Sequence, residues 1–280
     1  MSYQLAFAIN GKKGNKILQK SIQITVNKAG GGGGGEAPFW TSDQALSTNK
    51  TYDGNTFLPG NVILCTRAGS GDKKFKVENG VISWTGQRTR IYNIVSNLST
   101  MPENAFKNIG FEFEALRTES SGDRNMSVKF GNHGTDLWAD ANRWTFGGYG
   151  FAVERTRIGS KVEFYHNDHG CSEEKDLSEP IPLNQFLGYK FAWQNDEAKK
   201  EKVLTGWIRY PSDTTFKQVV QRRMTKSCWD PPSVPSGKND TNEIKAGPYL
   251  GPCHHVWIRN NEVGRLDVKN MKAYSIPAFT

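Results

Sequence analysis

Three stretches of the sequence repeat charged or aromatic residues at every second position. Their members are Arg88, Arg90 and Tyr92; Thr205, Trp207 and Arg209; and His255, Trp257 and Arg259. Residues two apart share one face of a β-strand, and the residues on the opposite face of each stretch are apolar or small. We therefore expect each set to face outward from the core of a β-sheet protein.

These residue types suit the recognition of an acidic sugar. Arginine pairs with a carboxylate through two parallel hydrogen bonds, and an aromatic ring offers a flat apolar surface to a sugar ring. If the three strands are neighbours in one sheet, they form a groove for an acidic polysaccharide, with predicted binding residues Tyr92, Trp207, Arg209, His255, Trp257 and Arg259. The alternative is that the tryptophans pack beneath loops and the arginines form ordinary surface ion pairs.

The same stretches contain groups that suit cleavage of a uronate polymer by β-elimination. That reaction needs a cation to neutralise the carboxylate, a base to remove the neighbouring proton and an acid for the leaving oxygen. The predicted catalytic residues are Arg88 and Arg90 as cations, His166 as base and Tyr165 as acid, with His255 and Tyr92 as alternatives for the last two roles. Each histidine also has a structural interpretation, as a hydrogen-bonded core residue at 166 or an anchor for a loop at 255.

The elements that would position these residues are β-strands. The clearest is a hairpin over residues 149–170, in which Tyr149, Phe151 and Val153 alternate with smaller or polar residues and Ile158 to Ser160 supply the turn. Further strands are predicted at 61–67, 75–84, 88–95, 109–116, 126–131, 185–194, 202–210, 216–223, 256–259 and 264–275. About a dozen short strands with regular turns predict an all-β, two-sheet sandwich or barrel.

Three segments together resemble the concanavalin-A-like jelly roll shared by laminin-G-type lectin modules, family-16-type glucanases and several polysaccharide lyases. They read GGYGFAVERTRIGSKVEFYHNDH, LNQFLGYKFAWQNDEAKKEKVLTGWIRYPSDTTFKQVV and HVWIRNNEVGRLDVKNMKAYSI. The resemblance covers residues 75–275 and implies a two-sheet antiparallel β-sandwich. Because this fold hosts many functions, the likeness concerns the fold more than the activity.

The enzyme motifs of the resembled families are largely missing. No E-x-D-x-E or E-x-D-x-x-E pattern occurs, which argues against retaining glycoside hydrolysis by paired carboxylates. Residues 87–92 and 163–166 are partial counterparts of two alginate-lyase motifs.

A metal site is a separate possibility. Calcium is common among the resembled proteins, and His166, Asp168 and His169 could hold a metal ion, but two histidines suit zinc better than calcium. We therefore assign no metal site and keep calcium as the candidate cofactor.

The N-terminal region reads as a separate arm. Two strand-like runs at 3–9 and 17–26 flank a turn-forming segment, and six consecutive glycines follow at 30–35. We divide the chain into a strand-forming arm at 1–29, a linker at 30–36 and a jelly-roll domain at 37–280. The arm either folds back on its own domain or adds a strand to a neighbouring subunit. In the second case the protein would assemble with copies of itself and would be a non-enzymatic structural or adhesive subunit of a filament or virion.

Composition sets the class of partner and the compartment. The chain has 36 Lys and Arg against 28 Asp and Glu, a net charge of +8, which favours a polyanionic partner. No nucleic-acid module signature is present, so an acidic polysaccharide is preferred. No apolar stretch is long enough for a membrane span, and the N-terminus is no ordinary signal peptide. We expect an extracellular or surface-exposed protein.

The four cysteines of the chain also bear on its compartment. They are Cys65, Cys171, Cys228 and Cys253, with no CxxC pair, which argues against a zinc ribbon or a thioredoxin-like site. Cys228 and Cys253 flank a loop rich in proline and glycine and are the pair expected to form a disulfide. The alternative is two buried free thiols.

Overall fold

The computed structural model divides the chain into two compact units, Met1–Glu36 and Ala37–Thr280. The structure describes residues 3–13, 16–26, 37–54, 56–60, 62–65, 74–85, 87–94, 107–119, 125–133, 146–164, 167–168, 171–229, 250, 255–261 and 263–280. Within these residues, no helix is long and apolar enough to cross a membrane, since α1 (Asp43–Leu46) and α2 (Lys226–Trp229) have four residues each.

The first unit contains one antiparallel hairpin. Strand β1 (Tyr3–Lys13) pairs with β2 (Lys16–Val26) along its whole length, from Tyr3 opposite Val26 to Lys13 opposite Lys16. The two strands are longer than the sequence predicts, because residues 10–13 continue β1 instead of forming a turn. The arm's role in assembly stays a prediction.

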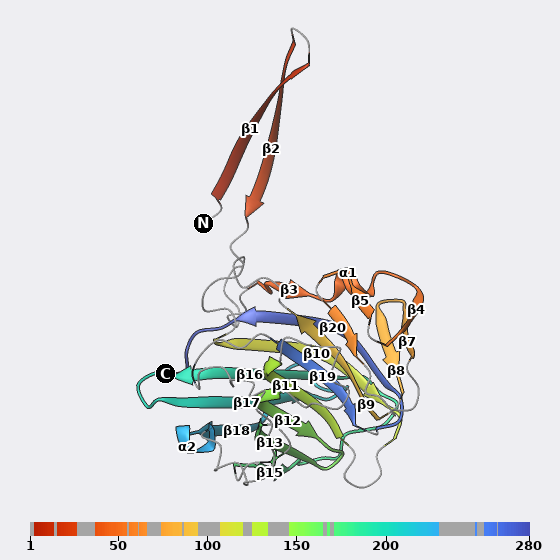
Figure 1. Ribbon diagram of the computed structural model, residues 1–280, viewed down its shortest axis with the longest axis vertical. Helices are drawn as coiled ribbons and strands as arrows, with labels where there is room; N and C mark the ends of the chain where they lie inside the picture. The colour runs from red at the N-terminus through yellow and green to blue at the C-terminus, as the bar shows by residue number, and fades with distance from the viewer. Residues whose placement is uncertain are drawn as a thin grey trace, which may run out of the picture. The chain divides into compact units, whose positions relative to one another are not determined.

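The second unit is a sandwich of two antiparallel sheets, which confirms the predicted fold class (Figure 1). In the first sheet the strand order is β18-β17-β16-β10-β20-β8-β7-β4, with β3 also pairing with β20. These strands are β3 (Trp40–Thr41), β4 (Lys50–Asp53), β7 (Lys74–Glu78), β8 (Val81–Trp84), β10 (Ile109–Arg117), β16 (Leu187–Asp196), β17 (Glu201–Arg209), β18 (Lys217–Met224) and β20 (Leu266–Ser275).

The second sheet has the order β14-β13-β12-β11-β19-β9-β6-β5, with β15 also pairing with β13. Its strands are β5 (Thr56–Leu58), β6 (Val62–Cys65), β9 (Gln87–Ile94), β11 (Asn125–His133), β12 (Phe146–Val153), β13 (Arg157–Phe164), β14 (Asn167–Asp168), β15 (Glu173–Asp176) and β19 (His255–Asn261). Strands distant in sequence are neighbours here, as β19 between β11 and β9 shows.

Alternating aromatic residues of both sheets form the core. On β16, Tyr189, Phe191 and Trp193 are at most 2 % exposed, as expected for every second residue of a strand that covers a core. Phe191 packs against Phe151 of the other sheet at 4.6 Å between ring centroids, and Trp193 packs against Phe130 at 5.3 Å. These contacts join the sheets face to face.

A buried lysine closes one end of this core. Lys202 is fully buried, and its Nζ donates hydrogen bonds to the Lys107 carbonyl at 2.8 Å and to Asn195 Oδ1 at 2.7 Å. The ammonium also lies 5.6 and 5.8 Å from the ring centroids of Phe130 and Tyr149. Oxygen acceptors and aromatic faces therefore take the place of water around this cation.

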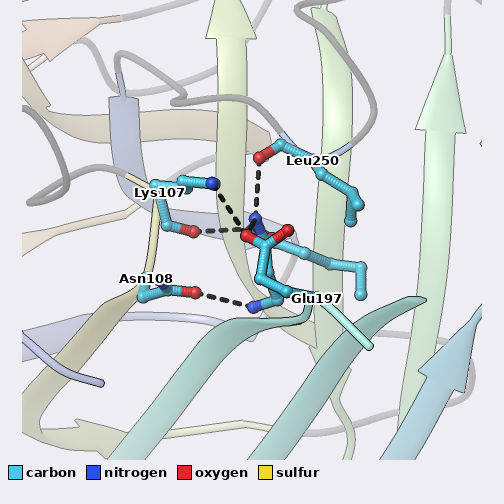
Figure 2. A network of polar contacts seen from close by, with 6 residues as sticks. Lys107, Asn108, Glu197 and Leu250 are labelled. Atoms are coloured by element: carbon cyan, nitrogen blue, oxygen red, sulfur yellow. Dashed lines mark hydrogen bonds and ion pairs between the residues drawn. The ribbon is translucent and has the colours of Figure 1, made fainter. Parts of the chain in front are cut away.

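Asn195 extends this contact into a network at the rim of the sandwich (Figure 2). Its Nδ2 donates to the Leu250 carbonyl at 2.7 Å and to Glu197 Oε1 at 3.1 Å, and its backbone N–H donates to Asn108 Oδ1 at 2.6 Å. Lys107 pairs with Glu197 at 2.7 Å, and the hydrogen bonds from Lys107 and Asn195 lower the pKa of Glu197. The network fixes Leu250 against the end of β16.

Two predicted elements differ from the structure. The 149–170 hairpin turns at residues 154–157, where the Glu154 N–H donates to the Arg157 carbonyl at 3.0 Å, and Ile158 to Ser160 belong to β13. An added Cβ at Gly159 would make only ordinary contacts with β12 and β15, so the strand does not require glycine at this position. The single strand predicted at 75–84 is a hairpin, with Asn79 and Gly80 at positive φ between β7 and β8.

The disulfide joins a different pair from the predicted one. Cys228 bonds to Cys171, not to Cys253, which lies outside the described residues. Cys171 precedes β15 of the second sheet, and Cys228 lies in α2, directly after β18 of the first. These two edges are adjacent, since Arg222 of β18 donates to the Ser160 carbonyl of β13 at 3.2 Å. The bond therefore connects the edges of the two sheets.

Candidate functional site

Two of the three predicted residue sets lie on neighbouring strands. Strand β9 pairs with β19, and the register places Tyr92 opposite Trp257 and Arg90 opposite Arg259. On the other side of β19, Trp257 lies opposite Lys129 and Arg259 opposite Ser127 of β11. Two adjacent rows of the second sheet thus bring together basic and aromatic residues that are far apart in sequence.

This part of the sheet is less exposed than the sequence predicts. Trp257 is 2 % exposed and Arg259 is 7 % exposed, although the core contains their neighbours Val256 and Ile258 and not Trp257. Lys129 is also buried and lies across Gly150, where an added Cβ would be 3.1 Å from its Cγ. Trp257 and Arg259 lie on the other face of β19 from Val256 and Ile258, but Trp257 is too buried to offer an open surface for a sugar.

The third set belongs to the other sheet. Trp207 and Arg209 lie on β17, so they cannot line one groove with β9 and β19. Arg209 pairs with Glu114 at 3.1 Å and lies over the Phe216 ring, and the Lys190 ammonium is 5.5 Å from the Trp207 ring centroid. The predicted six-residue groove is therefore wrong, because these two residues contact their own sheet. Trp207 and Arg209 have neither β9 nor β19 as a neighbouring strand.

The structure describes only part of the predicted catalytic set. Tyr165 and His166 lie outside the described residues, between β13 and β14. Four strand spacings separate β13 from β9, about 19 Å at the usual spacing between strands. A register shift between Asn260 and Asn261 also leaves Arg88 without a partner on β19.

The alternative base and acid lie closer to the arginine. His255 is opposite Ile94, and Tyr92 lies two residues from Ile94 on the same strand. Diagonal neighbours of this kind are about 7–8 Å apart. Arg90, Tyr92 and His255 therefore occupy one region of the sheet.

The structure describes only one of the three candidate metal ligands, Asp168. His166 and His169 lie outside the described residues. Within the part that the structure describes, no group of three His, Cys, Asp or Glu residues is placed to hold a metal ion.

A pocket lies in a different place, on the first sheet. It has a volume of about 380 Å³ and is lined by residues of α1, of the segments on either side of it, of the β7–β8 turn and of β20. Figure 1 shows where these elements lie in the second unit. The lining residues are Ser42, Asp43, Leu46, Ser47, Asn49, Asn79, Gly80 and Asn270. We call it the asparagine pocket.

Backbone geometry sets the shape of the asparagine pocket. Asn79 and Gly80 have φ of 51° and 76°, which are the conformations of a tight hairpin turn. Asn270 has φ of 53° and lies where the β10–β20 register shifts, so that β20 bulges outward. Asparagine adopts this left-handed region more readily than most residues. The turn and the bulge thus each present an asparagine to the cavity.

Hydrogen bonds hold the walls of the pocket together. The Ser42 N–H donates to the Met271 carbonyl at 3.0 Å, and the Met271 N–H donates to Ser42 Oγ at 3.1 Å. The Asn79 N–H donates to Asn49 Oδ1 at 2.9 Å. These bonds tie α1 to the bulge and the turn to the segment before β4, so the pocket is preformed.

The pocket presents hydrogen-bonding groups that the described residues do not use. The side-chain amides of Asn79 and Asn270 form no hydrogen bond there, and Asn49 uses only its Oδ1. Asp43 accepts one hydrogen bond from Thr41 Oγ1 at 3.0 Å. An amide donates and accepts, and a carboxylate accepts at two oxygens. Together they can bind adjacent hydroxyl groups of one small molecule.

The sequence contains one signal for this pocket. Asn79-Gly80 between apolar residues is a strong hairpin-turn signal, and it would have split the strand predicted at 75–84. The bulge at Asn270 has no comparable signal, because it depends on the register between β10 and β20. The approach of α1 to the turn depends on the tertiary fold in the same way.

Comparison with known proteins gives only remote likenesses. No protein-family model matches the chain, and no curated protein matches it. Similar solved structures include the carbohydrate recognition domain of Emp46p in its metal-free form, with 11 % identity, a TM-score of 0.46, and coverage of 86 % of this chain and 97 % of that chain.

Two further structures extend this group. The legume lectin-like domain from Entamoeba histolytica has 12 % identity and a TM-score of 0.43, with coverage of 77 % and 90 % of the two chains. Family 7 alginate lyase A1-II′ in complex with substrate has 8 % identity and a TM-score of 0.41, with coverage of 76 % and 86 %. They are of the lectin and lyase kinds that the sequence resembles, but scores below 0.5 assign no activity to this chain.

Proposed function

We propose that this protein binds carbohydrate and that the asparagine pocket receives a neutral sugar ring. The observation that carries the proposal is the convergence of Asp43 with the amides of Asn49, Asn79 and Asn270 around a preformed cavity. Its volume of about 380 Å³ is near the lower end of the range for small-molecule pockets, which suits one ring of a longer glycan.

The charge of the pocket selects the kind of sugar. None of the described residues that line it is Lys, Arg or His, and Asp43 supplies one negative charge. A carboxylate-bearing sugar would be repelled, since like charges at short range cost free energy. Hydroxyl groups, in contrast, can donate to Asp43 and exchange hydrogen bonds with the amides.

The first prediction concerns Asp43. We expect Asp43→Ala to lower the affinity for a neutral oligosaccharide by 10-fold or more, because a hydrogen bond to a charged group contributes about 1.5–3 kcal/mol. Titration calorimetry with a panel of neutral oligosaccharides measures this. Asn270→Ala should lower affinity less, because its amide is uncharged.

Asp53→Asn is the matched control, since Asp53 is an exposed carboxylate that pairs with Lys74 and lies outside the pocket. It should leave affinity unchanged. The proposal fails if the wild-type protein binds no neutral sugar, or if the Asp43 and Asn270 variants bind as tightly as the Asp53 variant.

A second candidate function is the binding of an acidic polysaccharide at β9 and β19, with cleavage by β-elimination. The register of Arg90, Tyr92 and His255 favours it, as does the net charge of +8. Arg90 would neutralise the uronate carboxylate, His255 would remove the proton and Tyr92 would protonate the leaving oxygen.

Absorbance of the unsaturated product tests this candidate. The wild-type protein should produce a rise with one polyuronate, and Arg90→Gln should reduce the rate by two orders of magnitude or more, which is typical for loss of one electrostatic stabiliser. Lys190→Gln, on the outer face of the other sheet, is the matched control and should be as active as the wild type. No rise with any polyuronate excludes cleavage.

The disulfide bears on where this binding takes place. Disulfides form and persist in oxidising compartments, and the Cys171–Cys228 bond supports the predicted extracellular or surface location. A carbohydrate-binding protein meets its ligand there.

A further inference from the structure

The hairpin of the first unit has two faces of opposite character. Strands β1 and β2 pair along their whole length, and the two members of each cross-strand pair lie on the same face. From base to tip, one face carries Tyr3 with Val26, Leu5 with Ile24, Phe7 with Ile22, Ile9 with Lys20 and Gly11 with Leu18. Eight of these ten residues are apolar. We call this the apolar face of the arm.

The opposite face is polar or small. It carries Gln4 with Thr25, Ala6 with Gln23, Ala8 with Ser21, Asn10 with Gln19 and Lys12 with Ile17. Alternation this regular is typical of a β-ribbon that packs one face against apolar residues and leaves the other in water. The register therefore gives the arm an amphipathic form.

The apolar face is large enough to be a contact surface. Each strand has eleven residues, a length of about 37 Å at about 3.4 Å per residue. Two strands spaced by about 4.8 Å give the face an area of about 360 Å². Apolar patches of this size are often interaction sites, and a two-stranded hairpin is only marginally stable in water without a packing partner.

The sandwich carries charged residues on the outer faces of its described strands. On the first sheet, Glu112 lies opposite Lys190 on one side and Lys272 on the other. On the second sheet, Lys129 lies opposite Trp257, and Arg259 lies two residues further along β19 on the same face. An apolar cover would remove such charges from water, which costs free energy. These faces are therefore a poor chemical match for the apolar face of the arm.

A second copy of the arm is the better match. Two apolar faces can pack on each other as the two layers of a β-sandwich do. The same patch then serves both copies, which is the isologous contact of a two-fold dimer. No charge has to leave water at the base of either arm, since its first three pairs are uncharged.

Charge on the apolar face sets the direction in which two arms pack. Its lysines, Lys13, Lys16 and Lys20, all lie in the half nearer the tip. Arms that point the same way bring the lysines of both copies together, and like charges repel. Arms that point in opposite directions place the lysines of each copy toward the uncharged half of the other. The middle pair of the five, Phe7 with Ile22, then lies at the two-fold axis.

We propose that this protein forms a homodimer in which the apolar faces of two arms pack against each other, antiparallel, with Phe7 and Ile22 at the centre. The contact is face to face and so differs from the addition of a strand to a sheet edge. It shares no residue with the asparagine pocket and does not depend on sugar binding. Its consequence is a particle with two such pockets, which can bind a long glycan at two points.

Sedimentation velocity of the full chain tests the dimer. Between about 1 and 100 μM, the wild-type protein should pass from a monomer to a species of twice its mass. Phe7→Lys should raise the dissociation constant of the dimer at least 10-fold, because it places a charge at the centre of the contact in both copies. A wild-type protein that stays monomeric over this range overturns the proposal.

Ala8→Lys is the matched control. Ala8 is the next residue of the same strand and lies on the opposite face. A lysine there adds the same charge to the chain and should leave the dimer as strong as in the wild type. Equal weakening by Phe7→Lys and Ala8→Lys contradicts a contact through the apolar face.

Cysteine cross-linking gives a second readout that does not depend on the lysine variants. Phe7→Cys should be joined to its counterpart by a short bis-maleimide, because the two copies of residue 7 meet at the two-fold axis. Ala8→Cys should not be joined, and the wild-type protein controls for the native cysteines. A dimer that links equally well at residues 7 and 8, or at neither, overturns the face-to-face arrangement. If Phe7→Lys does not fold, this result decides the matter.

Discussion

Loss of the Cys171–Cys228 disulfide should lower the free energy of unfolding by about 4 kcal/mol. The two cysteines are 57 residues apart, and closing a loop of that length in the unfolded chain removes conformational entropy of this order. The bond also joins the edges of the two sheets, so its loss frees α2 from the second sheet.

Chemical denaturation of the Cys171→Ser/Cys228→Ser double variant measures the effect. Reductant provides the internal control: it should shift the wild-type midpoint to that of the variant and leave the variant unchanged. A variant with the wild-type midpoint would show that the two cysteines are not joined in the folded protein.

Replacement of Lys202 by alanine should cost about 3–5 kcal/mol of stability. The ammonium satisfies the Lys107 carbonyl and Asn195 Oδ1, and removal of one member of a buried charged network leaves the others without a partner. The change also creates a cavity beside Phe130 and Tyr149. Both effects act at the end of the core, where Leu250 is fixed.

Equilibrium urea unfolding measures this cost. Lys190→Ala is the control, because Lys190 is a half-buried lysine on an outer face that contacts one aromatic ring, and it should cost less than about 1 kcal/mol. Equal costs for the two variants would mean that the network contributes no more than a surface contact.

The sandwich could be predicted from the sequence because apolar and polar residues alternate strongly along its strands. Phe111 and Phe113 on β10, or Tyr189 and Phe191 on β16, occupy every second position and are buried, so two strands could be placed from their residues alone. The short strands β3, β14 and β15 have two to four residues, which is too few to show a period. The predicted turn of the β12–β13 hairpin is wrong because Gly159 is typical of a turn, whereas in the structure it pairs with Ala152 inside β13.

The candidate site was harder to predict, since it depends on which strands are neighbours. Arg90 and Arg259 show the same alternation as Arg209, yet β9 and β19 share a sheet and β17 lies in the other. The exposure of Trp257 was misjudged for a similar reason, because alternation gives the face of a sheet and not what covers that face. The asparagine pocket combines a turn, a bulge and a short helix that only the tertiary fold brings together.

The linkage between the sheet edges also has a consequence for solubility. An edge strand exposes unpaired backbone groups that can pair with another molecule and begin aggregation. Cys171–Cys228 and Arg222 fasten the β18 edge to the β13–β15 edge, so a strand from another molecule finds that side obstructed. The edge strands at the opposite ends of the two sheets, β4 and β5, have only four and three residues. They therefore offer few backbone groups for pairing with another molecule. Reduction of the bond should therefore expose a longer edge, and the reduced protein should aggregate faster than the oxidised protein at the same temperature.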